Sequence, residues 1–131
     1  MTIEVKQPPQ VEIDGVTYEL STKLRVAYKV QGQNAHKPYA EIFSQIDTMT
    51  IEKQIDILYA AFEVANSEAA RLKITRQVFL DHYLDNYDVG MVMDQLQDVI
   101  GGILGKDLKA EAEKKSSATS RAEGADDTEG N

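Results

Sequence analysis

The chain contains no cysteine, and it has only two histidines among its 131 residues. Without cysteine there is no disulfide framework, no thiolate zinc site and no cysteine nucleophile. His36 and His82 lie far apart in the sequence, and neither has a second ligand at the spacing typical of a metal site. The carboxylates form no recognisable catalytic pattern. We therefore expect no metal, no cofactor and no enzymatic activity.

Basic residues are outnumbered, with 14 Lys and Arg against 22 Asp and Glu and a net charge of −8. Phosphate contacts need a basic face, so we expect no nucleic-acid partner. No apolar run approaches the length of a membrane span, and the N-terminus does not have the pattern of a signal peptide. These absences predict a soluble, cytoplasmic protein that does not associate with membranes. The acidic balance favours a basic protein partner.

The clearest local pattern is "VEIDGVTYEL" at residues 11–20, where apolar and polar side chains alternate. Asp14-Gly15 suits a two-residue type I′ turn, so the stretch predicts a β-hairpin with Val11 opposite Tyr18. In this register five apolar side chains share one face. They are Val11, Ile13, Val16, Tyr18 and Leu20. Their burial cannot offset the backbone entropy lost in a lone ribbon, so the hairpin needs a cover.

In the hairpin, apolar residues recur at every second position. After the hairpin they recur at every third or fourth position, which is typical of helices. The first predicted helix is capped by Ser21 or Thr22 and ends at Gly32. Its predicted inward face carries Leu24, Ala27, Tyr28 and Gln31. A second helix follows Pro38, with an apolar face from Tyr39 to Ile46.

Three further helices have clear starting signals. Thr50 is expected to cap the strongest and most central helix, at residues 51–65. The predicted inward stripe of this helix consists of Ile51, Ile55, Leu58, Tyr59, Phe62 and Ala65. Thr75 is expected to cap the next, whose predicted inward residues are Val78, Phe79, Tyr83 and Leu84. Asp88 is expected to cap the last, which runs toward Gly105. Residues 67–73 either continue the central helix or form a separate turn.

The predicted fold class is α+β and mostly α: an N-terminal β-hairpin packed on a compact bundle of about five helices, followed by a disordered acidic C-terminal tail. Residues 1–10 are a flexible lead-in, and residues 11–106 form a single domain. Residues 107–131 are polar, partly helical at their start and then disordered.

Two patterns in the last two predicted helices suggest a partner-binding site. Like-charged aspartates stand four residues apart in both, and such pairs are unfavourable on a helix. Met91, Val92 and Met93 are consecutive, so they cannot all face one core. One of the two methionines is expected to line an exposed groove, because methionine suits adaptable binding surfaces. The candidate residues are Asp81, Asp85, Met91, Met93, Asp94, Leu96 and Asp98. A solvated acidic face and ordinary core packing remain open alternatives.

The order of three motifs resembles a known family. The hairpin "VEIDGVTYEL", the aromatic "VFLDHYLDN" and the amphipathic "VGMVMDQLQDVIGGILGK" together resemble tail assembly chaperones of long-tailed bacteriophages, especially phages of Firmicutes. The resemblance covers about residues 11–106. It implies a non-catalytic protein that binds the tape measure protein, keeps it soluble and helps bring tail tube subunits to it. It also implies absence from the finished virion.

Other functions remain open on the sequence alone. One alternative is a small acidic phage regulatory or inhibitor protein, and another is a structural head–tail connector component. The free edges of the hairpin also allow self-association.

Overall fold

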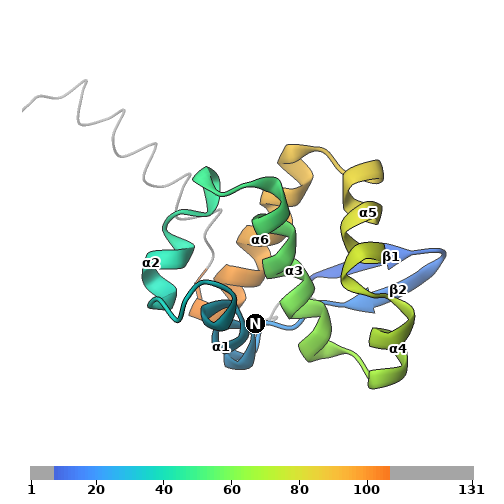
Figure 1. Cartoon of the computed structure of the whole chain (residues 1–131), viewed down its shortest axis with the longest axis horizontal. Coiled ribbons are helices and arrows are strands. Elements are labelled where there is room, and N and C mark those ends of the chain that lie inside the picture. Colours follow the sequence, from blue (N-terminus) through green and yellow to red (C-terminus); the bar gives the residue numbers. More distant parts are fainter. Residues whose placement is uncertain (1–7, 107–131) are drawn as a thin grey trace, which may run out of the picture.

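The computed structural model describes residues 8–106, and within them it places a two-stranded hairpin before six α-helices and one 3-10 helix (Figure 1). The elements are β1 (Gln10–Ile13), β2 (Val16–Glu19), α1 (Leu24–Gln33), α2 (Tyr39–Phe43), η1 (Ile46–Thr48), α3 (Ile51–Ala65), α4 (Glu68–Lys73), α5 (Arg76–Asn86) and α6 (Val89–Leu104). The predicted α+β, mostly helical fold class is confirmed. The disorder predicted for residues 107–131 and most of the predicted lead-in lie outside the described residues.

The hairpin forms in the predicted register. Asp14 and Gly15 have φ of 53° and 80°, as a type I′ turn requires, and Val11 pairs with Tyr18. One expectation is wrong: Val16 is exposed. It lies beside the turn, which projects away from the helices (Figure 1). The other four apolar side chains of the stretch are buried.

Helix α3 packs against the apolar face of the hairpin. The ring of Tyr18 meets the ring of Phe62 edge-on, with 5.4 Å between centroids. The side-chain amide of Asn66, just past the end of α3, donates to the backbone carbonyl of Glu19 at 3.0 Å. Burial of the apolar face against α3 therefore provides the stabilisation that an isolated hairpin lacks.

Helix α3 lies at the centre of the bundle and contacts α1, α5, α6 and β2 (Figure 1). The predicted caps are confirmed: the side chains of Thr50, Thr75 and Asp88 each accept a hydrogen bond from a backbone N–H of the first turn. Ser67 does the same for α4, so residues 67–73 form a separate helix.

Both predicted ends of α1 are wrong. The residue at the N-cap is Lys23, whereas Ser21 or Thr22 was expected, and the helix continues through Gly32. Ser21 contributes differently, because its hydroxyl accepts a hydrogen bond from the amide of Lys23 at 3.0 Å.

Several apolar residues that were expected to face inward are exposed. They are Leu24, Tyr28, Tyr39, Ile51, Val78 and Leu84. In α1 the buried side chains are Val26, Ala27 and Val30. The helix carries more apolar residues than one face can hold, so its neighbours decide which face is buried.

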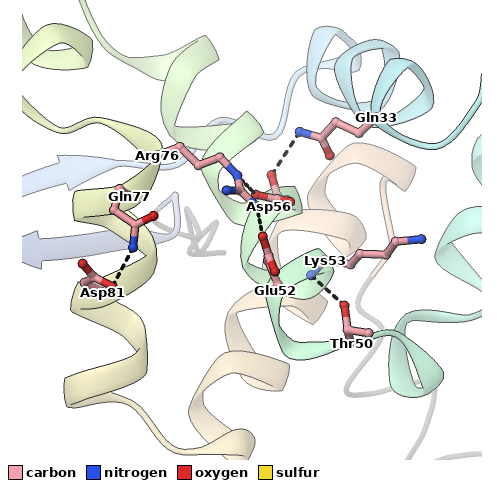
Figure 2. Close-up of polar contacts among 8 residues, drawn as sticks. All are labelled: Gln33, Thr50, Glu52, Lys53, Asp56, Arg76, Gln77 and Asp81. Atoms are coloured by element: carbon pink, nitrogen blue, oxygen red, sulfur yellow. Dashed lines mark hydrogen bonds and ion pairs between the residues drawn. The ribbon is translucent and has the colours of Figure 1, made fainter.

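The outer surface of α5 is joined to α3 by an ion cluster (Figure 2). The guanidinium of Arg76 donates two hydrogen bonds to the carboxylate of Asp56, at 2.7 and 3.0 Å, and a third to Glu52. Such a bidentate pair fixes orientation as well as distance. The pair between Arg76 and Asp56 holds the N-terminal end of α5 beside α3.

A close backbone approach joins the end of α6 to the chain just before α1. A Cβ atom at Gly102 would lie 2.5 Å from Cγ2 and 2.6 Å from Cβ of Thr22. Only glycine allows this approach.

Candidate partner-binding site

The two aspartates predicted on α5 lie on its outer surface. Asp81 and Asp85 are both exposed, one helical turn apart. The side-chain amide of Gln77 donates to Asp81 at 2.9 Å, which holds that carboxylate along the helix (Figure 2). Both carboxylates are therefore accessible to a partner.

The structure does not bring the α6 candidates into one groove. Leu96 is fully buried in the core, so its predicted role in partner binding is wrong. Asp94 and Asp98 are each two residues from Leu96, which places them about 200° around the helix axis from it. Met91 and Met93 are likewise two residues apart, with Met91 exposed and Met93 packed against the core.

A different hollow lies close to the predicted site. It has a volume of about 110 Å³ and lies where the start of α3, the end of α5 and the start of α6 meet. We call it the α3–α5–α6 pocket. Its lining residues are Ile51, Gln54, Ile55, Tyr83, Leu84, Tyr87, Asp88, Val89 and Val92.

The rim of this pocket consists of apolar side chains that are exposed to solvent. Ile51, Leu84 and Val89 are 50%, 53% and 66% exposed, and each comes from a different helix. Ile55 and Val92 are buried and belong to its lining. A small hollow edged by exposed aliphatic groups is suited to receiving an apolar side chain from another protein.

Two tyrosines, with rings in contact and tilted by 32° to each other, form part of the wall. The rings of Tyr83 and Tyr87 lie 4.3 Å apart, and the hydroxyl of Tyr83 donates to the side-chain carbonyl of Gln95. Gln95 in turn donates to the backbone carbonyl of Gln10 at 2.8 Å, which ties this wall to β1. Tyrosine is uncharged at neutral pH, and burial raises the pKa of both side chains further above their ordinary value. The wall is therefore neutral and held by neighbouring elements.

On the α5 and α6 side of the pocket the charge has one sign. Residues 77–105 contain five aspartates and no lysine or arginine. Asp88 lines the pocket and also caps α6, since its Oδ1 accepts from the amide of Met91 at 2.8 Å. Asp85 lies next to Leu84 of the rim. A partner with cationic groups beside its apolar side chains would be complementary to this surface.

The predicted site residues lie on α5 and α6, which supply part of this pocket, but the sequence analysis did not include the α3 contribution. Ile51 stood in the predicted buried stripe of the central helix, and Leu84 in that of the next. Each lies at the edge of its stripe, at the first turn of α3 and the last turn of α5. That position at an end of an apolar stripe is the signal that could have found them.

Within residues 8–106, no group of three or more histidine, aspartate or glutamate side chains is placed to hold a metal ion. In the same part of the chain, no helix is both long and apolar enough to cross a membrane. Comparisons of the chain with protein families, curated proteins and solved structures found no match.

Proposed function

We propose that this protein is a tail assembly chaperone of a long-tailed bacteriophage. It binds the tape measure protein, keeps it soluble and helps recruit tail tube subunits during tail morphogenesis. It acts without catalysis in the cytoplasm of the infected cell and is absent from the mature virion. The resemblance of residues 11–106 to that family supports the proposal, and the observation that carries it is the apolar rim of the α3–α5–α6 pocket.

The pocket suits a helical client better than a small molecule. Its volume of 110 Å³ is well below the roughly 300–1,000 Å³ of ordinary ligand pockets. A long helical protein such as the tape measure protein presents apolar stripes that aggregate when uncovered. One side chain of such a stripe enters the pocket, and its neighbours rest on Ile51, Leu84 and Val89.

The aspartates give the contact its charge preference. Asp88 lines the pocket, Asp85 follows the rim residue Leu84 in sequence, and Asp81 lies one helical turn before Asp85. They favour client segments with lysine or arginine beside the apolar stripe, and they speed encounter with such segments at low ionic strength.

Co-expression tests the proposal. The tape measure protein encoded in the same phage genome is produced with and without this chain, and its soluble fraction and co-elution in size-exclusion chromatography are measured. We expect the wild-type chain to keep it soluble and to co-elute with it. Leu84→Asp and Val89→Asp should abolish both effects, because each places a charge on the apolar rim.

Leu72→Asp is the matched control. Leu72 is 73% exposed on α4, outside the pocket, so this variant should behave as wild type. A tape measure protein that stays insoluble beside the wild-type chain would refute the proposed function. Equal loss with Leu72→Asp and Leu84→Asp would refute the pocket as the site.

Charge reversal tests the acidic surface separately. Asp81→Lys with Asp85→Lys should weaken co-elution and reduce its sensitivity to salt, because both carboxylates are exposed. Unchanged salt sensitivity would show that these two aspartates do not contact the client.

A further inference from the structure

A second exposed apolar surface lies on α1, away from the pocket. Leu24 and Tyr28 are 74% and 70% exposed, and they are one turn apart on the same side of the helix. Together with Lys23 and Arg25 they line a shallow hollow on the surface. We call these four residues the α1 face. In Figure 1, α1 lies at the lower left and α5 at the right, so the two surfaces are well separated.

The α1 face has the opposite charge to the pocket surface. Residues 20–40 contain four lysines and arginines and no aspartate or glutamate, in a chain whose net charge is −8. Lys23 and Arg25 are adjacent in sequence to Leu24, on either side of it. Among the described residues, neither Lys23 nor Arg25 has a carboxylate within 4.0 Å. The apolar pair is therefore flanked by two cations that have no carboxylate partner within residues 8–106.

The α1 face is held in place by the packing of the buried side of the same helix. Val26, Ala27 and Val30 on the opposite side of α1 are buried. The segment leading into the helix is held as well, since the amide of Ser21 donates to the carbonyl of Ala61 at 3.0 Å. A surface held in this way loses little conformational entropy when a partner binds.

We infer that the α1 face binds an amphipathic helix whose apolar stripe is flanked by carboxylates. Leu24 and Tyr28 form a ridge of residues four apart, which packs into the groove between corresponding ridges of a second helix. Glutamate or aspartate beside that groove pairs with Lys23 and Arg25. This inference goes beyond the proposed function: it assigns a second site, of opposite charge preference, which does not depend on the pocket or on its client.

A designed peptide provides the probe. A labelled helical peptide of about 18 residues, five turns, carries a leucine stripe with glutamates on both sides. Its twin has glutamine at every glutamate position. Binding to the full chain is measured by fluorescence anisotropy at two salt concentrations. We expect the glutamate peptide to bind about tenfold more tightly than the glutamine peptide, with the difference shrinking at the higher salt.

Variants of exposed residues locate the contact. Leu24→Ser with Tyr28→Ser should weaken the glutamate peptide about tenfold or more, because the apolar ridge is lost. Lys23→Glu with Arg25→Glu should weaken the glutamate peptide and leave the glutamine peptide unchanged. Leu72→Ser, at an equally exposed leucine of α4, should bind as wild type. Circular dichroism confirms that each variant is folded.

Five outcomes would overturn the inference. The two peptides could bind equally, or Leu24→Ser with Tyr28→Ser could bind as wild type. Leu84→Asp could abolish binding, which would place the contact in the α3–α5–α6 pocket. Sedimentation could show that the wild-type chain self-associates through the α1 face, or a peptide of residues 107–131 could displace the probe. Either of these last results would make a second copy or the chain's own acidic segment the occupant.

Discussion

Two glycine-to-alanine substitutions in helices should have opposite effects on stability. Gly32 and Gly102 lie inside α1 and α6, and alanine is favoured over glycine in a helix by about 1 kcal/mol. A Cβ at Gly32 meets nothing within 4 Å, so no steric cost offsets the gain from Gly32→Ala. Its thermal midpoint should rise by about 4–8 °C.

At Gly102 the same gain is outweighed by a steric overlap. The new Cβ would lie 2.6 Å from Cβ of Thr22, an atom that no side-chain rotation can move. The end of α6 must therefore shift away from residue 22, and overpacking of this kind costs about 1–3 kcal/mol. We take a value in the upper part of that range, so Gly102→Ala should be destabilised by about 1–2 kcal/mol after the helix gain.

Urea unfolding followed by circular dichroism measures both variants. Two more chains, Thr22→Gly alone and Gly102→Ala with Thr22→Gly together, complete a double-mutant cycle with Gly102→Ala. Because Thr22→Gly removes the clashing Cβ, Gly102→Ala should become stabilising in that background. If Gly102→Ala in the natural background is as stable as Gly32→Ala, the close approach of α6 to Thr22 does not exist.

Three further changes test the core, a cap and a buried hydroxyl. Phe79→Ala removes a fully buried ring and should cost about 3–5 kcal/mol in urea unfolding; a loss below about 1 kcal/mol would contradict its place in the core. Thr75→Ala removes the hydroxyl that accepts from the amide of Val78 and should cost about 1 kcal/mol in the same assay. Burial raises the pKa of Tyr83, so the unfolded chain loses that proton first and stability should fall above about pH 10. Tyr83→Phe should reduce this fall in thermal melts across that range, whereas Tyr28→Phe, at an exposed hydroxyl, should not.

Local signals predicted the elements well because their causes are local. Asp14-Gly15 adopts the positive φ values of its turn without help from the rest of the chain. Thr50, Thr75 and Asp88 cap helices through hydrogen bonds that span only three residues. Leu96 shows the limit: its spacing marked an apolar face, but spacing alone cannot distinguish a core from a groove.

The candidate site was predicted only in part, because residue spacing does not show which helices meet in the folded chain. The aspartates of α5 and the helix boundary at Asp88 were visible in the sequence. Ile51 was not linked to them, because its approach to Leu84 and Val89 depends on how α3 packs beside α5 and α6. The two apolar residues of the α1 face, Leu24 and Tyr28, were assigned to the core because they have helical spacing and look like an inward stripe.

The amino-acid sequence by itself determined the hairpin register, most helix starts and the segregation of charge into a basic stretch and an acidic one. These depend on backbone preferences, short-range hydrogen bonds and composition. Only the tertiary structure decided which apolar faces stay uncovered. Helices such as α1 and α5 carry more apolar surface than their neighbours can bury, and the choice is made by packing against α3, the hairpin and the Thr22–Gly102 contact.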